Sequence, residues 1–327
     1  MCWHPLPDGA GADDDRIAAR RARFREASAS PFGPADEVGM LNLVTPESRA
    51  RVLAAADAST LFDLSVEYFP GMPSWTATGD PSYQIWMSHT PSGSIAESTS
   101  DARRAQYELA SYSGDCIAMY THCGTHVDTL NHFGYRGRIW NGFRPDDHLG
   151  SRHWNVAGAE KHPPIVARGI LVDVAALHGV TMLPDSYGIG AHDLGAALAR
   201  QNVTLQPGDV VLIRTGRMTV WPDRDRYLMN EPGINREGAE LLAKAGAIMI
   251  GGDNVGLEQQ PTVDPENRHV VHTYLLAECG IPILEVVDLE ALAAERLYEF
   301  AFVGACIRLR GATGSPMRPL AFPFRRI

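Results

Sequence analysis

The sequence predicts an α/β fold with a mixed sheet at its core and helices beside it. Two patterns in the second half of the chain lead to this prediction. Apolar runs at 164–174, 210–215 and 247–251 have the length and composition of buried strands. Helical patterns at 192–201 and 236–245 separate these runs. Strands that alternate with helices in this order are typical of a partly parallel sheet.

The first half of the chain contains shorter elements with clear local signals. Thr45 and Pro46 supply an N-cap and a first helical residue, so a helix is expected from there to about Ala56. The other expected elements are strands at 61–68, 84–89 and 105–111 and a turn at 70–73. Residues 1–31 are polar and are expected to form an N-terminal leader. No long linker rich in Pro, Gly or Ser follows, so residues 32–327 are expected to form one domain.

The composition argues against several classes of protein. The formal net charge of −10 disfavours nucleic acid and anionic membrane surfaces as partners. No apolar run approaches the roughly 20 residues of a membrane span, and no basic region followed by an apolar stretch marks a secretory signal. The five cysteines are odd in number and widely scattered, which favours free thiols in a reducing compartment. We therefore expect a cytoplasmic protein with a small-molecule substrate.

Residues 122–132 contain three of the chain's twelve histidines and one aspartate. Imidazole and carboxylate groups together form a donor set that first-row divalent metals bind well. The candidate residues are His122, His126, Asp128 and His132. A single histidine is more often a hydrogen-bonded core residue, whereas this local density favours a metal site.

The spacing of these four residues favours an extended but bent segment. On a helix, His126 would share a face with His122, while the other two side chains would lie elsewhere. On a strand, all four offsets are even, so the side chains point to one side. A straight strand would separate the first and last Cα atoms by about 33 Å, too far to share an ion. Bends are therefore expected at Gly124 and over 129–131, with His126 and Asp128 best placed to chelate together.

Two downstream segments contain further candidates. His272 begins a short predicted helix that ends at Gly280, and a strand follows to Glu285. A glutamate between apolar strand residues carries a heavy desolvation cost unless a charge such as a metal ion compensates it. The glycine-rich segment 251–256 follows an apolar strand. Its Asp253 is expected to orient a metal-bound histidine, with a plain strand-ending turn as an equal alternative.

Two aromatic residues, Phe69 and Trp75, bracket the turn at 70–73. They are candidates for a wall of a substrate site. Core packing is the alternative, and it is the more common role of a large aromatic side chain.

Taken together, the motifs resemble those of the cyclase superfamily, which contains bacterial kynurenine formamidase and isatin hydrolase. The resemblance rests first on the pattern His-x-Gly-Thr-His-x-Asp-x-x-x-His-Phe, which starts at His122 and ends at Phe133. Further similar blocks lie at 69–73, 208–216, 275–285 and 311–319. The similarity extends from about residue 60 to the C-terminus.

The resemblance implies a swivelling β/β/α fold and a homodimer or homotetramer. It also implies that His122, His126 and Asp128 bind a first divalent metal. Asp128 would bridge to a second metal held by His272 and Glu285, so one or two ions per chain are expected. Zinc is the usual ion of His/Asp sites, and carboxylate-rich pairs also suit manganese.

By the same resemblance, His132 would be the catalytic base. A metal lowers the pKa of bound water from about 15.7 towards about 7. A histidine with an ordinary pKa of about 6.5 suits transfer of the released proton to a leaving group. The sequence therefore predicts a metal-dependent hydrolase that cleaves an amide, lactone or cyclic amide bond of a small aromatic or unsaturated substrate.

Three alternatives remain open. The same metal and base would also support a cyclase or dehydratase acting on a polyketide-type intermediate. A non-catalytic metal-binding protein is the second alternative. The third is a cysteine hydrolase that uses Cys123 or Cys279. Cys123 occupies an odd position between the even-numbered candidates, so its side chain is expected to point into packing.

Overall fold

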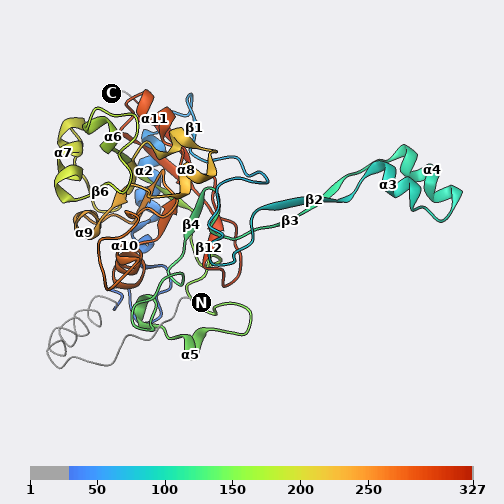
Figure 1. The fold of residues 1–327 in the computed structure, drawn as a ribbon, viewed down its shortest axis with the longest axis horizontal. Helices are drawn as coiled ribbons and strands as arrows, with labels where there is room; N and C mark the ends of the chain where they lie inside the picture. Colours follow the sequence, from blue (N-terminus) through green and yellow to red (C-terminus); the bar gives the residue numbers. More distant parts are fainter. Residues whose placement is uncertain (1–28, 326–327) are drawn as a thin grey trace.

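A nine-stranded mixed sheet organises residues 29–325, the part of the chain that the computed structural model describes (Figure 1). Its strands are β1 (Phe62–Asp63), β4 (His126–Asp128), β5 (Ile165–Asp173), β7 (Val210–Arg214), β9 (Met249–Gly252), β10 (Ile283–Glu285), β11 (Glu299–Gly304), β12 (Gly314–Pro316) and β13 (Leu320–Pro323). Their order is β1-β13-β11-β5-β7-β9-β10-β4-β12. The central strands β5, β7, β9 and β10 run parallel, and antiparallel pairs extend the sheet on both sides.

Helices, turns and two small ribbons connect the strands of the sheet. The α-helices are α2 (Pro46–Ala55), α3 (Pro91–Ala96), α4 (Asp101–Leu109), α5 (Pro145–His148), α6 (Val174–Leu177), α7 (Ala191–Gln201), α8 (Arg224–Leu228), α9 (Arg236–Lys244), α10 (Val270–His272) and α11 (Glu290–Ala294). The 3₁₀ segments are η1 (Gly39–Leu43), η2 (Trp140–Gly142) and η3 (Arg217–Val220), and η4 (Thr273–Cys279) is a π-helix. The ribbons pair β2 (Gln84–His89) with β3 (Gly114–Ala118) and β6 (Gly188–Ile189) with β8 (Gly233–Ile234).

Apolar clusters cover both faces of the main sheet. Side chains alternate along β5, so Ile170 belongs to one cluster and Leu171 to the other. The first cluster includes residues of α7 and α9, such as Leu242, and the second includes Leu292 of α11. Because both faces are covered, the parallel strands are nearly continuous apolar runs in the sequence.

The structure confirms the predicted α/β class with a mixed sheet and flanking helices. The helix at 46–55 begins as expected, because the Thr45 side chain accepts from the Ser48 backbone N–H. The strand expected at 61–68 is much shorter, since only 62–63 pair with β13. The predicted leader at 1–31 lies almost wholly outside the described residues. Among the helices of the described part, none is long and apolar enough to cross a membrane.

The prediction of a strand at 105–111 is wrong, because these residues belong largely to helix α4. The Ser100 side chain caps this helix by accepting from the backbone N–H of Arg103 at 3.3 Å. Residues with high helix propensity, mainly alanine, arginine, glutamine and glutamate, then continue it. Helices α3 and α4 lie at the tip of a long projection, and the ribbon β2–β3 forms its stalk (Figure 1).

Candidate metal centre

The register of the sheet brings together the candidate metal ligands of β4 and β10. Strand β4 lies between β10 and β12, and His126 is the direct cross-strand partner of Glu285. Residues paired in this way project to the same face. The Nε2 atom of His126 accordingly lies 3.3 Å from the Glu285 Oε2 atom and 3.3 Å from the Oδ1 atom of Asp128. All three side chains are buried.

A bend at Gly124 brings His122 back to the same carboxylate. Gly124 has a φ of +59°, and a Cβ atom there would lie 2.5 Å from the ring of Tyr68. The hydroxyl of Tyr68 donates to the carbonyl of Thr125 at 2.6 Å, which holds the bend against the body. The Nδ1 atom of His122 then lies 2.6 Å from the Asp128 Oδ1 atom. The predicted bend at Gly124 is confirmed.

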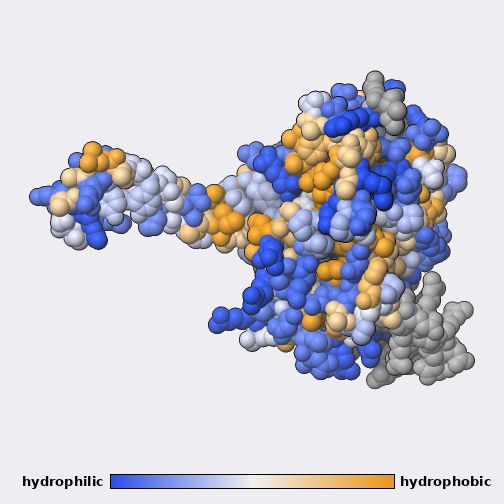
Figure 2. Space-filling model, turned by 180° about the vertical axis from the view of Figure 1, so that it is seen from behind, coloured by the Kyte–Doolittle hydropathy of each residue, from blue (hydrophilic) through white to orange (hydrophobic). Residues whose placement is uncertain are grey.

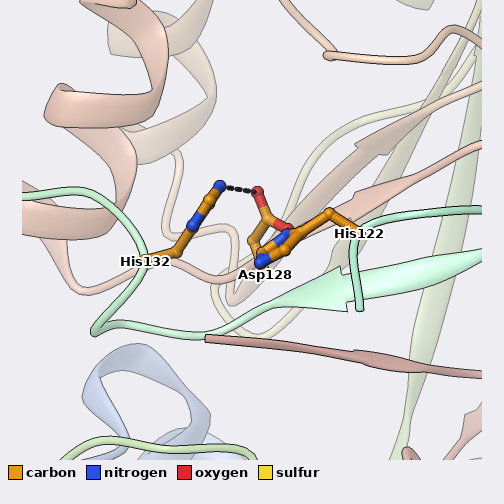
Figure 3. A group of neighbouring side chains, drawn as sticks. All are labelled: His122, Asp128 and His132. Atoms are coloured by element: carbon orange, nitrogen blue, oxygen red, sulfur yellow. Dashed lines mark hydrogen bonds and ion pairs between the residues drawn. The ribbon is translucent and has the colours of Figure 1, made fainter. Parts of the chain in front are cut away.

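A second turn, after β4, returns His132 to Asp128. The backbone N–H of His132 donates to the carbonyl of Thr129 at 3.0 Å, and the Thr129 hydroxyl donates to Asn131 at 2.7 Å. The rings of His132 and His122 stack with centroids 3.8 Å apart. Figure 3 shows the Asp128 carboxylate beside both imidazoles, with its Oδ2 atom 3.7 Å from His132 Nε2.

The C-terminal Gly-Ala-Thr-Gly motif makes room for His122. Gly314 is the cross-strand partner of Asp128, and a Cβ atom there would lie 2.5 Å from the His122 ring. The preceding residue, Thr313, places its hydroxyl 2.9 Å from the Nε2 atom of His122. A larger residue in place of Gly314 would therefore displace this histidine.

His272 reaches the cluster from α10, directly before the π-helix η4. π-Helices are rare and occur frequently at functional sites. The Nε2 atom of His272 lies 3.2 Å from Glu285 Oε1 and 3.7 Å from Asp128 Oδ2. Its other ring nitrogen, Nδ1, lies 2.5 Å from Glu258 Oε1. Glu258 also accepts from the backbone N–H groups of Val271 and His272 at 3.3 and 3.2 Å. All six sequence-predicted metal and catalytic residues thus lie in one cluster.

Glu258 has the contact that the sequence analysis assigned to Asp253. Asp253 instead accepts from the backbone N–H and hydroxyl of Thr215 and from the N–H of Gly216, so it fixes the turn after β7. The prediction for Asp253 is therefore wrong. Glu258 follows it by five residues, and a second acidic residue after the same strand was the available signal.

The two aromatic residues proposed from the sequence have different surroundings. Phe69 packs edge-on against Trp221, with ring centroids 6.2 Å apart. It adjoins the apolar cluster that contains Cys123, whose side chain points into packing as expected. Trp75 remains 44% exposed.

Two other aromatic rings touch the histidines directly. The ring of Tyr120 lies 4.9 Å from that of His122, and the ring of Phe133 lies 4.7 Å from that of His132. The sequence analysis assigned neither ring to the site. The signal was their position, since each stands within two residues of a candidate histidine.

Burial and charge set the protonation of the cluster. Burial disfavours the charged form of His126, but Asp128 and Glu285 outweigh it and raise its pKa to about 10. Burial and the neighbouring His122 lower the pKa of His132 well below its usual range, against the opposing charge of Asp128. The lowered pKa favours the neutral form of the His132 ring and disfavours its imidazolium, so a nearby negative charge such as that of Asp128 is needed when the ring accepts a proton.

Glu258, the hydrogen-bond partner of His272, is held in its ionised form. Burial alone would raise the pKa of Glu258, but its contacts with His269 and His272 outweigh burial and lower it to about 2. By contrast, burial raises the pKa of both Cys123 and Cys279 to about 12. Thiols with such pKa values are poor nucleophiles at neutral pH, which argues against the cysteine-hydrolase alternative.

The donor set fits a divalent cation. Within residues 29–325, His126 Nε2 and Asp128 Oδ2 are buried and have no hydrogen-bond partner. Asp128 and Glu285 each direct one oxygen towards His126 and the other towards His272. Bonds of about 2.1 Å at tetrahedral angles separate neighbouring ligands by about 3.4 Å. The separations here, 3.2 to 3.7 Å, are close to this value.

Comparison with known proteins agrees with this architecture. The sequence model of a family described as "Putative cyclase" matches residues 62–259. A solved structure described as a novel cyclase has 26% sequence identity and a TM-score of 0.76, with 89% of this chain and 96% of that chain covered. No curated protein matches the sequence of this chain.

Two further solved structures share the fold at lower identity. Isatin hydrolase A from Ralstonia solanacearum has 18% identity and a TM-score of 0.60, with 80% of this chain and 91% of that chain covered. A protein from Bacillus stearothermophilus described as a predicted metal-dependent hydrolase has 18% identity and a TM-score of 0.52, with 80% and 98% covered. The sheet of the present chain, with its flanking helices, is the fold of these structures.

Proposed function

Since the chain belongs to the cyclase family, we propose that it is a metal-dependent hydrolase. The proposed reaction cleaves an amide, lactone or cyclic amide bond of a small aromatic or unsaturated molecule. The main support is one observation: His132 lies 3.7 Å from the same aspartate around which the other imidazoles gather. Two of the similar structures are described as hydrolases, which agrees with the proposal.

The ligand assignment follows the family pattern, and the distances within the cluster also bring His126 close to Glu285. We propose that His122, His126 and Asp128 hold one ion and that His272 and Glu285 hold a second with Asp128. Two orphaned buried atoms support cation binding, His126 Nε2 and Asp128 Oδ2. Zinc is the proposed ion, and manganese is the alternative because carboxylates contribute much of the donor set. A bound divalent ion would supply Lewis-acid polarisation of a carbonyl and would acidify water.

The side chains of the chain itself would handle the proton and position the substrate. His132 is proposed to accept a proton at Nε2 and to pass it to the leaving group, with Asp128 stabilising the imidazolium formed. The rings of Tyr120 and Phe133 flank the histidines and are proposed to hold a flat, unsaturated substrate by stacking. Phe69 and Trp75 are proposed to extend this wall.

A panel of formamides, lactones and cyclic imides tests the proposal directly. The enzyme should release a new carboxylate or formate from at least one class, and chelation should abolish the release. His132→Ala should retain metal, measured by elemental analysis, but lose at least about a hundredfold in kcat, within the usual range for a general base. His148→Ala, on α5 and outside the cluster, serves as the matched control. Full turnover by His132→Ala would exclude its role as base.

The description of the family favours a second candidate function, a cyclase or dehydratase. The same base would then remove a carbon-bound proton instead of a proton from water. Conversion of a polyketide-type substrate without release of a new carboxylate would support this reaction over hydrolysis. A protein that binds metal but converts no substrate would instead support the non-catalytic alternative.

The location of the protein is also a proposal. The described cysteines Cys116, Cys123, Cys279 and Cys306 are free thiols. Free thiols suit a reducing compartment, so we propose the cytoplasm. Fractionation of cells that produce the protein would test this.

A further inference from the structure

The imidazole of His272 lies between two sets of polar side chains. Its Nε2 atom faces the proposed metal centre, 3.2 Å from Glu285 Oε1. Its Nδ1 atom faces Glu258, and the Nδ1 atom of His269 lies 3.7 Å from the same carboxylate. Donor atoms of Glu258, His269 and His272 all lie within 4.8 Å of one another, close enough to share a cation. The proposed centre does not use this outer set of donors.

The distances give the two histidines of the outer set different roles. Glu258 Oε1 and His272 Nδ1 lie 2.5 Å apart, as in a short hydrogen bond, whereas two ligands of one ion lie about 3.4 Å apart. His272 therefore donates its Nδ1 proton to the carboxylate. His269 Nδ1, at 3.7 Å, is too far for a hydrogen bond and close to the spacing of two ligands. Within residues 29–325, this atom is buried and has no hydrogen-bond partner. Glu258 and His269 are thus the pair available to an ion.

Glu258 also lines a cavity of about 450 Å³ at the start of α9. Val263, another lining residue, is 77% exposed, so the cavity opens to solvent. It has room for the water molecules that complete the coordination of a cation with two protein ligands. The cationic side chain in its lining, Arg236, is already paired with Glu240 and Glu278. Four carboxylates line the same cavity: Glu237, Glu258, Asp264 and Glu266. This excess of negative charge raises the local concentration of cations.

We propose that Glu258 and His269 bind a divalent cation weakly beside this cavity, and that ions reach the buried centre by way of this outer site. The centre needs such a route, because His126 and Asp128 have no exposed surface. Two protein ligands hold an ion less firmly than the larger set of the centre, so an ion at the outer site exchanges readily. Glu258 is hydrogen-bonded to the ring of His272, so this ion lies one imidazole away from the inner carboxylates. The inference rests on the proposed metal centre.

Electron paramagnetic resonance of Mn²⁺ tests for the outer site. The full chain is loaded with Zn²⁺, freed of excess and titrated with Mn²⁺, which does not displace Zn²⁺ from a shared site. The wild type should bind one further, weak equivalent of Mn²⁺, and His269→Phe should lose it. Phenylalanine keeps a ring against Phe133, whose centroid lies 5.0 Å from that of His269, and circular dichroism checks the fold. His192→Phe is the matched control, since His192 is exposed on α7 and outside the cavity.

The rate at which metal-free protein takes up Zn²⁺ tests the route. When Zn²⁺ is supplied as its complex with a chromophoric chelator, His269→Phe should take it up at least about tenfold more slowly. Its final affinity should stay within about twofold of the wild type, because the inner ligands are unchanged. Equal rates in the two proteins would overturn the route, and a wild type without the weak Mn²⁺ equivalent would overturn the outer site.

Failure of the proposed centre would give a different result. The wild type would then hold no tightly bound Zn²⁺, and the route would fall with the centre. The weak Mn²⁺ equivalent and its loss in His269→Phe would still support the outer site, because neither measurement needs the inner ion. An equal weak equivalent in His269→Phe would overturn the assignment of His269.

Discussion

Replacing Glu258 by glutamine should weaken metal binding without unfolding the protein. The carboxylate lies 2.5 Å from His272 Nδ1 and also accepts two backbone N–H groups at the start of α10. It therefore fixes the orientation of the ring and directs the lone pair of Nε2 towards Asp128 and Glu285. Glutamine keeps the size of the side chain but removes its charge. In glutamine, one of the two side-chain oxygens is also replaced by an NH₂ group, which would face the backbone N–H donor of Val271.

The expected loss follows from the hydrogen bonds involved. A hydrogen bond to a charged group contributes about 1.5–3 kcal/mol, and a neutral one contributes about 0.5–1.5 kcal/mol. The exchange therefore costs about 1–1.5 kcal/mol for the His272 contact, or about five- to thirteenfold in affinity. The mismatched contact with the Val271 N–H adds a similar amount. The total lies within the ten- to hundredfold loss typical of residues that orient metal ligands.

Competition with a chromophoric chelator measures this loss for Zn²⁺ and for Mn²⁺. Glu237→Gln is the matched control, because Glu237 lines the same cavity as Glu258, of about 450 Å³, and is exposed. The control should bind metal as the wild type does. Thermal unfolding of the metal-free proteins should show that both variants are folded. An affinity of Glu258→Gln within twofold of the wild type would refute the orienting role.

Two further substitutions test the role of Glu285 as a metal ligand and the pKa of the buried His162. Elemental analysis of Glu285→Gln should show the loss of one equivalent of metal if two ions bind, and the loss of nearly all metal if one ion binds. An unchanged metal content would show that Glu285 is not a ligand. Burial lowers the pKa of His162 to about 4, although its Nδ1 contacts the Pro163 carbonyl. Because the unfolded chain binds this proton at about pH 6.5, stability is full above that pH and falls by up to about 3 kcal/mol as the pH drops to about 4. In urea unfolding, His162→Gln should lose this part of the pH dependence, and a slope equal to that of the wild type would contradict the assignment.

The shape of the histidine segment could be predicted because it depends on local rules. Even spacing along an extended chain puts His126 and Asp128 on one face, and only a bend returns His122. Gly124 was the one residue between the histidines able to adopt a left-handed conformation without strain. The structure has this bend, with φ at +59°. The roles of these side chains as metal ligands remain a proposal.

The contact between Glu258 and His272 could not be predicted because it depends on distant parts of the chain. The short helix before η4 must meet the segment after β9, and no local pattern specifies their distance. The projection formed by β2, β3, α3 and α4 is a similar case, and Figure 2 shows apolar surface along its stalk. The strand at 84–89 was predicted correctly from its residues, but local residues do not tell whether a second layer covers a strand. A strand was predicted at 105–111 in place of helix α4, because the prediction did not take account of Ser100 as an N-cap.

The pairing of β4 with β10 also determines when during folding the cluster is completed. Next to the paired residues, the hydroxyl of Thr125 donates to the carbonyl of Val286, 161 residues away along the chain. Contacts at such separation form late, after the loops between them have closed. A nascent chain would present only the histidines of the first segment and no complete set of donors. Ion uptake therefore belongs to the finished protein, and the polypeptide should reach its fold before it acquires metal.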